Sequence, residues 1–335
     1  MKRIFLLLLG LLLLSGCQPQ KHDSQTFAMD TIMQFTAYGP KGQQALAHAS
    51  ARVQELDQLF SVTRSTSEIY AVNHAQGEPV ALSEDTARLL AQSLELCSQT
   101  GGALDITAYP AVRAWGFTTG DYQVPSADEL LALAAQIDYT QVELTENQVR
   151  LPEGMELDFG AVAKGYTGEV LAQELRELGV ESAILTLGGN VQTIGSRPGG
   201  DPWRIGVQDP EGDGYLMVLS LVDQAAVTSG GYQRFFDADG ERYWHIMDPA
   251  SAAPARSGLT SVTIVGDSGT QCDGLSTALF VMGLEEGTQF WRDHRELEFE
   301  AIFVTEAGAI YHTAGLTDRF FLAEGYEDRE VTVLE

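Results

Sequence analysis

The amino-acid sequence predicts an α+β fold in which mixed sheets pack against helices. Apolar residues recur at helical spacing over residues 43–59, 84–98 and 161–178, and Gly179 follows the third segment as a stop signal. Strand-like runs bounded by turn residues lie at 182–187, 203–207, 216–222, 261–265 and 300–305. Because helices and strands follow one another without a strict β-α-β rhythm, the order favours mixed sheets over a doubly wound parallel sheet.

Shorter features complete the expected elements. Ser126 opens a capping box with Glu129, which predicts a short helix that ends near Ile137. Asp239-Gly240 lies between two aromatic pairs, and Ala307-Gly308 lies between two apolar runs, so each predicts a β-hairpin. The 34 glycines are scattered without a period, which indicates tight turns rather than a repeat array.

The composition restricts the class of partner. The chain has 335 residues with 47 acidic and 20 basic side chains, and its formal net charge is −27. Binding to nucleic acid depends on clustered Lys and Arg that displace counterions, so we expect no nucleic-acid partner. Cys97 and Cys272 lie in apolar stretches far apart in the sequence, which predicts buried free thiols and no disulfide framework.

The first residues read as an export signal. Two basic residues precede an apolar run over residues 4–14, which is shorter than the roughly 20 residues of a membrane-spanning helix. The run ends in Leu-Ser-Gly-Cys17, which resembles the bacterial lipobox, in which the cysteine is diacylated and becomes the first mature residue. We expect a signal peptide over 1–16, a lipidated tether over 17–26 and a single domain over 27–335, held at a bacterial cell membrane and facing away from the cytoplasm. An ordinary signal peptide with an incidental cysteine is the alternative.

Two stretches in the N-terminal half carry residues suited to a nucleotide pyrophosphate. Over 100–107, Gly101-Gly102 allow close backbone approach to a ligand, and Asp105 can accept hydrogen bonds from it. Over 157–166, small residues lead into a helix N-terminus whose free N–H groups suit a phosphate, and Lys164 adds a positive charge. The structural alternatives are a Gly-Gly turn with a capping aspartate and a helix start with a surface lysine.

Two further stretches lie in the C-terminal half. His245 lies beside an aromatic pair at the end of a strand, where functional residues are commonly presented. Asp273 and Thr277 are four residues apart, which places a carboxylate and a hydroxyl on one helix face, suited to a hard cation that also takes phosphate oxygens. A structural histidine and compensation of the helix dipole are the alternatives. The other histidines are expected to be incidental, in the tether or in polar surroundings: His22, His48, His74, His294 and His312.

Other catalytic patterns receive little support from these 335 residues. The sequence has no Walker loop, so the Lys164 segment is not a P-loop. It also has no His-Glu-x-x-His, no Cys-x-x-Cys and no Ser-His-Asp order, which argues against hydrolase triads and structural zinc sites.

In their order and spacing, these motifs resemble the ApbE family of FAD:protein FMN transferases over nearly the whole mature chain. Each motif is weak alone, and the series is specific. The motifs are Ala28-Met29-Asp30-Thr31, Phe60-Ser61, Ser67-Glu68-Ile69 with Asn73, residues 102–107 and 158–166, Gly188-Gly189-Asn190, Ser229-Gly230, and residues 245–249 and 273–277. The family fold is an α+β body with the flavin site between sheet and helices, in agreement with the pattern of elements.

The resemblance implies a Mg²⁺-dependent enzyme that moves FMN from FAD to a Thr or Ser hydroxyl of an acceptor flavoprotein and releases AMP. It implies metal ligation by Asp273, Thr277 and the backbone carbonyl of Ala161. It places FAD against the positions that match the family's binding residues: Met29, Ala103, Leu104, Asp105, Lys164, Asn190, His245 and Met247. The acceptor is expected to be an exported flavoprotein, either a subunit of a membrane redox complex or an extracellular reductase.

The sequence departs from the family pattern at a few positions. Asp30 stands where the family usually has Gly, and Thr63 stands where several members have a Tyr that stacks on the ligand, so Tyr70 or Trp115 would have to supply the aromatic face. Gly168-Glu169 replaces the usual Val-Asp, and Ala252-Ala253-Pro254 replaces Thr-Gly-x-Pro, which changes a turn.

The expected catalytic residues are Asp273, which holds the metal ion, Lys164, which assists at the phosphoryl group, and His245, which acts as general base. One alternative is an FAD pyrophosphatase, in which water replaces the protein hydroxyl and the products are FMN and AMP. A second is a non-catalytic lipoprotein that binds FAD, and a third is a lipoprotein that captures another ligand.

Overall fold

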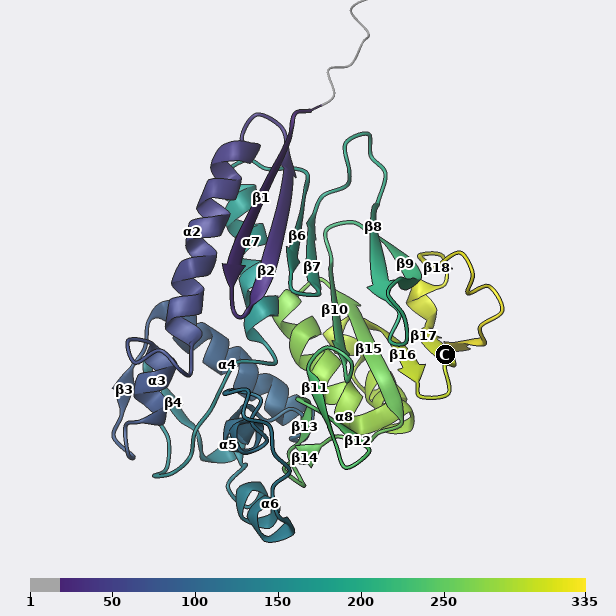
Figure 1. Cartoon of the computed structure of the whole chain (residues 1–335). Coiled ribbons are helices and arrows are strands. Elements are labelled where there is room, and N and C mark those ends of the chain that lie inside the picture. The colour runs from purple at the N-terminus through teal and green to yellow at the C-terminus, as the bar shows by residue number, and fades with distance from the viewer. Residues whose placement is uncertain (1–18) are drawn as a thin grey trace, which may run out of the picture.

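A computed structural model describes residues 19–335, and a nine-stranded sheet forms its centre (Figure 1). The strand order is β1-β2-β6-β7-β10-β15-β16-β17-β19, and neighbouring strands are antiparallel except for β17 with β19. Their bounds are β1 Lys21–Ala28, β2 Thr31–Tyr38, β6 Ala183–Leu187, β7 Asn190–Ile194, β10 Ala225–Gly230, β15 Leu259–Gly266, β16 Glu300–Thr305, β17 Ile310–Thr313 and β19 Val331–Leu334.

Long helices cover one face of this sheet. The helices α2 (Gly42–Phe60) and α7 (Ala163–Glu177) pack on the first strands, and α8 (Gly269–Asp293) packs on β10, β15 and β16. The remaining helices are α3 Glu68–Asn73, α4 Glu84–Gln99, α5 Tyr109–Ala114 and α6 Ala127–Ala134, with 3₁₀ turns η1 Ile106–Ala108, η2 Tyr139–Gln141, η3 Arg295–Leu297 and η4 Ala314–Leu316.

A second sheet covers the opposite face of the later strands. Alternation along β16 divides the core, because Ala301 and Phe303 face the helices while Ile302 and Val304 face this second sheet. Its strands are β8 Trp203–Gln208, β9 Tyr215–Leu221 and β18 Phe320–Leu322. The remaining short strands are β3 Val80–Ala81, β4 Glu143–Thr145, β5 Gln148–Arg150, β11 Phe235–Ala238, β12 Glu241–Trp244, β13 Met247–Asp248 and β14 Ala253–Pro254.

The expected α+β class is confirmed, and so are the expected helices and strands. The predicted helices over 43–59, 84–98 and 161–178 correspond to α2, α4 and α7, and α7 begins two residues later than expected. The Ser126 half of the capping box is formed, since its hydroxyl accepts the Glu129 N–H at 3.3 Å, and α6 ends at Ala134, before the expected Ile137. Asp239-Gly240 joins β11 to β12, and Ala307-Gly308 lies between β16 and β17, as predicted.

Two expectations about the chain are wrong. Residues 21–26, assigned to the tether, form most of β1, which pairs with β2 along its whole length. Both faces of β1 are polar up to Thr26, so the strand has no apolar alternation and is held by its pairing with β2 and by hydrogen bonds from Gln54 of α2 to Thr26 and Phe27. His312, expected in polar surroundings, is buried in β17 and its ring stacks on Phe320 with centroids 4.8 Å apart.

The expected signal peptide, the lipobox and Cys17 lie outside the described residues. Within residues 19–335, none of the helices combines the length and the apolar character needed to cross a bilayer. Cys97 and Cys272 are buried free thiols, as expected.

A glycine pair allows α7 and α8 to cross closely. A Cβ atom on Gly165 would lie 2.1 Å from the carbonyl oxygen of Gly269, and a Cβ on Gly269 would lie 2.5 Å from the carbonyl oxygen of Gly165. Real side chains do not tolerate such contacts, so both positions require glycine. The close approach lets the Gly165 N–H donate to the Asp273 carboxylate at 2.8 Å.

We expect Gly165→Ala to destabilise the protein. The added methyl group gains about 1 kcal/mol of helix propensity, but overpacking against the α8 backbone costs roughly 1–3 kcal/mol or more. The urea midpoint of unfolding should therefore fall. Gly214→Ala is the matched control, because a Cβ there meets no atom within 4 Å. An unchanged midpoint for Gly165→Ala would contradict the close crossing.

Candidate functional site

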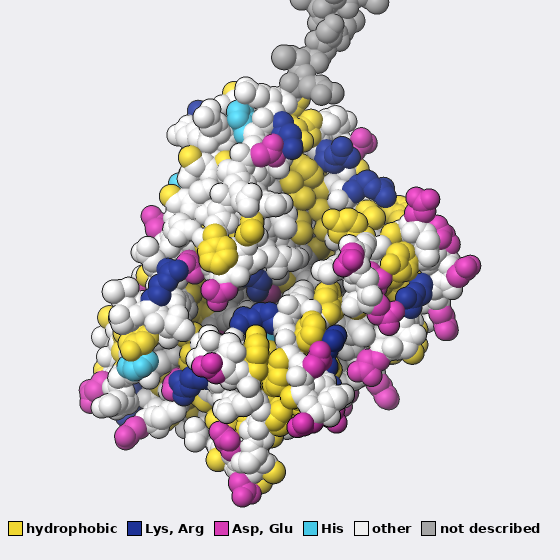
Figure 2. Space-filling view, in the orientation of Figure 1, with side chains coloured by type: hydrophobic (Ala, Val, Ile, Leu, Met, Phe, Trp, Pro, Cys, Tyr) yellow, Lys and Arg dark blue, Asp and Glu magenta, His cyan; other side chains and the backbone are white. Residues whose placement is uncertain are grey.

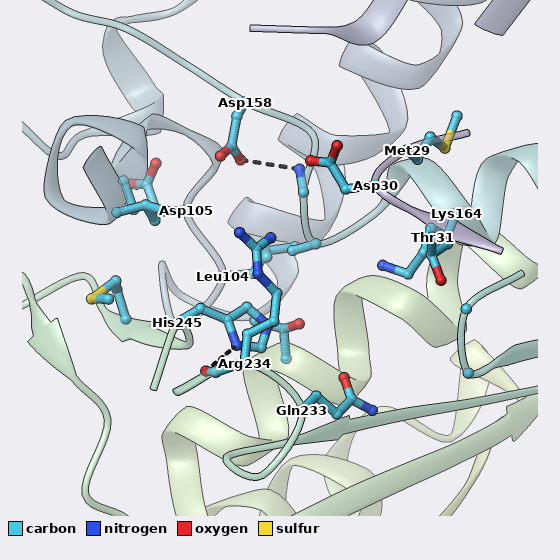
Figure 3. A pocket seen from close by; sticks show the side chains of 18 of the residues that line it. Met29, Asp30, Thr31, Leu104, Asp105, Asp158, Lys164, Gln233, Arg234 and His245 are labelled. Atoms are coloured by element: carbon cyan, nitrogen blue, oxygen red, sulfur yellow. Dashed lines mark hydrogen bonds between the residues drawn. The ribbon is translucent and has the colours of Figure 1, made fainter. Parts of the chain in front are cut away.

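A cavity of about 750 Å³ lies where the β1–β2 turn, the start of α7 and the segment before α5 meet the loop after β10 (Figure 3). Figure 2 shows this hollow on the front of the molecule, with basic side chains inside it. The predicted site residues that line the cavity are Met29, Ala103, Leu104, Asp105, Ala161, Lys164, His245, Met247 and Thr277. Asn190 and Asp273 are the predicted residues that lie behind its wall, and both are buried.

A second cavity of about 340 Å³ adjoins the first. The two share part of their walls, including Asp30, Asp158, Lys164 and Arg234. The hollow therefore has two compartments that meet at a group of charged side chains.

The β1–β2 turn is fixed by a buried aspartate. Met29 and Asp30 form a two-residue turn with φ of 49° and 58°, a left-handed conformation that Asp tolerates better than most residues. The Met29 N–H donates to Asp57 Oδ1 at 3.0 Å, and Asp57 Oδ2 pairs with Arg64 at 2.6 Å. Asp57 thus holds the turn against the wall of the second cavity.

The Asp105 carboxylate is engaged by the protein itself. Its Oδ1 accepts the Thr107 N–H at 2.8 Å and the Thr107 hydroxyl at 2.7 Å, and its Oδ2 accepts the Tyr139 N–H at 3.0 Å. Burial raises the Asp105 pKa, although these hydrogen bonds favour the charged form. Asp105 therefore caps η1, the structural alternative, and it also forms part of the cavity wall.

Two basic side chains, Lys164 and Arg234, face both compartments (Figure 3). Arg234 was not among the predicted site residues, and its guanidinium donates to the Phe117 carbonyl. The sequence signal that could have indicated it is its place two residues after Gly230-Gly231-Tyr232 in a chain with few basic residues. The two cations place positive charge at this cavity beside the carboxylates of Asp30 and Asp158, and a phosphate ligand can pair with them.

Asp158 lines both compartments together with these cations. Its Oδ1 accepts the Gly160 N–H at 3.1 Å. Burial raises the Asp158 pKa to about 6, while the Gly160 N–H, Arg234 and Lys164 oppose the rise. The folded protein therefore binds a proton here more readily than the unfolded chain does.

We expect Asp158→Asn to stabilise the protein at pH 7. A pKa raised in the folded state destabilises it above the unfolded pKa, so the variant should gain about 1 kcal/mol after allowance for solvent screening in the cavity. The gain should shrink as the pH falls from 7 towards 4, because the wild-type carboxyl is then protonated. Urea unfolding of both proteins between pH 7 and 4 measures this difference in the free energy of unfolding. Asp138→Asn is the opposite control, since hydrogen bonds from Thr140 lower the Asp138 pKa.

His245 is a neutral imidazole at the cavity wall. Its Nδ1 lies 3.2 Å from the Arg234 carbonyl oxygen, a contact that favours the tautomer with hydrogen on Nδ1. Burial and the positive charges of Arg234 and Lys164 lower the His245 pKa to about 4. In that tautomer, Nε2 carries a free lone pair at neutral pH, which a general base requires.

Asp273 and Thr277 lie on one face of α8, as predicted. The Asp273 carboxylate is buried and its pKa is raised by that burial, opposed by Lys164 and the Gly165 N–H. The side-chain nitrogen of Asn190 has no hydrogen-bond partner within the described residues. Thr277 Oγ1 lies 3.2 Å from the Ser229 hydroxyl oxygen and reaches the cavity wall.

The donor set fits a hard cation. It consists of the Asp273 carboxylate, the Thr277 hydroxyl and the backbone of Ala161 at the cavity wall. The neighbouring groups do not fully offset the cost of burying the Asp273 charge, since its pKa stays raised. Within residues 19–335, no group of three or more His, Cys, Asp or Glu side chains is placed to hold a metal ion. The predicted set contains one such side chain, Asp273, and its other two ligands are the Thr277 hydroxyl and the Ala161 backbone carbonyl.

The aromatic cover is not supplied by the expected residues. The Tyr70 ring stacks on His74 at 3.8 Å, and buried Trp115 donates to the Ala252 carbonyl, so neither lines the two cavities. Thr63 does line the second cavity, where Tyr109 and Phe117 contribute aromatic walls. Both rings come soon after the Asp105 segment in the sequence, and this closeness to a predicted site segment could have indicated them.

Glu169 has a structural role at the neighbouring helix. Its Oε2 accepts hydrogen bonds from the Ser268 hydroxyl and from the N–H and hydroxyl of Thr270, at the first turn of α8. A carboxylate at the N-terminus of a helix accepts hydrogen bonds from its free N–H groups and interacts favourably with the helix dipole. Glu169 thereby fixes the start of the helix that carries Asp273.

Known proteins match most of the chain. A family model described as the ApbE family matches residues 29–303. An FAD:protein FMN transferase of Treponema pallidum is 32% identical over 82% of this chain and 81% of its own length, and one of Klebsiella pneumoniae is 33% identical over 82% and 87%. The ApbE protein of Thermotoga maritima has a similar structure, with a TM-score of 0.82, 32% identity, and coverage of 87% of this chain and 96% of that one. The structure of the flavin transferase ApbE of Vibrio cholerae has a TM-score of 0.80 and 27% identity, and the match covers 90% of this chain and 99% of that one. The chain belongs to the ApbE family.

Proposed function

We propose that this protein transfers FMN from FAD to a Thr or Ser hydroxyl of an acceptor flavoprotein and releases AMP. The observation that carries the proposal is the meeting of Lys164, Arg234 and His245 at the cavity that Thr277 also lines. Relatives and solved structures named as flavin transferases support it.

The two cations bind and orient the pyrophosphate. Lys164 and Arg234 face the cavity where its two compartments meet, so the phosphates lie there and the two ends of FAD extend into the compartments. Asp273, Thr277 and the Ala161 carbonyl would hold Mg²⁺ beside them. A bound Mg²⁺ supplies charge stabilisation to the phosphoryl oxygens.

The reaction is an in-line displacement at phosphorus. The acceptor hydroxyl oxygen forms a bond to the FMN-side phosphorus, and the bond from that phosphorus to the bridging oxygen breaks, so AMP leaves. The hydroxyl proton passes to Nε2 of His245, whose pKa rises from about 4 as negative phosphate comes close. Lys164 and Arg234 stabilise the charge that develops on the phosphoryl and leaving oxygens.

We also propose that the protein acts as a lipoprotein on the outer side of a bacterial cell membrane. The lipobox-like sequence before Cys17 supports this placement. The acceptor would then be an exported flavoprotein.

Mass spectrometry of the acceptor tests the proposed function. The full chain is incubated with FAD, Mg²⁺ and an exported flavoprotein domain with a Thr or Ser flavinylation site, and the acceptor is expected to gain the mass of FMN less water. Free FMN and AMP with an unmodified acceptor would instead identify an FAD pyrophosphatase. FAD that stays bound and intact would identify a non-catalytic FAD-binding protein.

A further inference from the structure

The outer face of the β1–β2 hairpin carries two exposed apolar side chains beside the cavity. Phe27 is 65% exposed and Ile32 is 52% exposed, and they are cross-strand partners, so they form one pair. The turn that joins them contributes Met29, Asp30 and Thr31 to the cavity wall. Figure 2 shows apolar side chains on this hairpin directly above the hollow.

The pair lies outside the hydrophobic core. Alternate residues of the hairpin, among them Ala28, Met33 and Phe35, are buried against α2 and α7, whereas Phe27 and Ile32 point to the other face. An adjoining row on that face is uncharged and comes from three strands, because Gln25 pairs with Gln34 and Gln34 pairs with Thr186. An exposed apolar pair on an uncharged surface, in a chain of net charge −27, is typical of a contact site for another molecule.

The position of the pair argues against a lipid surface. Phe27 lies near the end of β1, whereas Lys21 begins the strand and lies four residues after Cys17, the expected lipidation site. Six residues of extended chain place the pair roughly 20 Å from that start. The pair is therefore close to the cavity and far from the point at which a lipid anchor would hold the chain.

We infer that Phe27 and Ile32 form the docking surface for the acceptor flavoprotein, which contacts them with uncharged apolar side chains next to its Thr or Ser hydroxyl. This inference rests on the proposed function. A protein hydroxyl can reach the phosphates only if the acceptor surface covers the rim of the cavity. At this rim the acceptor would bury the apolar surface of Phe27 and Ile32, and removing that surface from water favours binding.

Steady-state kinetics with the full-length double variant F27S/I32S tests the inference. The acceptor domain flavinylated in the mass-spectrometric experiment serves as the substrate. The KM for the acceptor is expected to rise about tenfold or more, as for loss of an apolar anchor, while kcat and the KM for FAD stay unchanged. Phe27→Leu keeps an apolar contact and should retain most of the acceptor affinity.

Leu131→Ser is the matched control, because Leu131 on α6 is 71% exposed and lies away from the cavity wall. An unchanged acceptor KM in F27S/I32S, or an equal rise in the KM for FAD, would overturn the docking surface and leave the transferase proposal intact. Absence of transfer by the wild type and by every variant would overturn the proposed function, and the docking surface with it.

Discussion

Asp273→Asn should abolish metal-dependent FMN transfer and leave the protein folded. The variant keeps an oxygen that can accept the Gly165 N–H, and it removes a buried charge whose pKa is raised by desolvation, so the free energy of unfolding should not fall. Loss of the carboxylate removes the one anionic ligand of the proposed Mg²⁺ site. Charge stabilisation by such an ion is worth several kcal/mol, so the rate should fall about 10³-fold or more. In-gel flavin fluorescence of the acceptor against Mg²⁺ concentration measures it.

Two further variants show whether the loss is specific to the proposed ligands. Asp293→Asn removes an exposed carboxylate from the far end of the same helix and should transfer at the wild-type rate. Thr277→Val should lose most activity and Thr277→Ser should keep it, because serine retains the hydroxyl. If Asp273→Asn transfers FMN with the wild-type dependence on Mg²⁺, the metal assignment is wrong.

The apolar pattern of the sequence was sufficient to predict the fold class and its main elements. Helices α2 and α4 each bury one stripe, and β16 alternates between two cores, so periodicity reports them directly, whereas residues 165–168 near the start of α7 are all buried. Strand β1 was missed because its residues are polar on both faces up to Thr26 and its position depends on pairing with β2. Pairing between strands is a tertiary property that composition does not record.

The site was predictable where a residue type is tied to a local motif. Lys164, His245 and Thr277 reach one cavity, although they come from α7, the β12–β13 connection and α8. Arg234 was missed because its role comes from the fold, which places its guanidinium against the Phe117 carbonyl at the cavity. The lowered pKa of His245, about 4, likewise comes from the fold, because burial and two neighbouring cations cause it. Such a shift depends on the surroundings in three dimensions.

His245→Ala should slow FMN transfer by about 10²–10⁴-fold, the usual contribution of a general base, while FAD still binds. Binding should survive because Lys164 and Arg234, which face the phosphates, are unchanged. Single-turnover transfer and the quenching of FAD fluorescence separate the two effects. His294→Ala, at an exposed end of α8, is the matched control and should behave as the wild type.

The pH dependence distinguishes a base from a residue that only shapes the cavity. In the free enzyme His245 has a pKa of about 4, so its base form predominates above that value and kcat/KM for the wild type should fall as the pH drops through it. In His245→Ala this fall should be absent from the residual rate. A depressed histidine pKa also makes the wild type lose stability as the pH falls from 6.5 towards 4, so unfolding must be measured in parallel. Wild-type rates in His245→Ala, or the same pH profile in both proteins, would remove the proton-accepting role and leave charge stabilisation by Lys164 and Arg234 as the chain's own contribution.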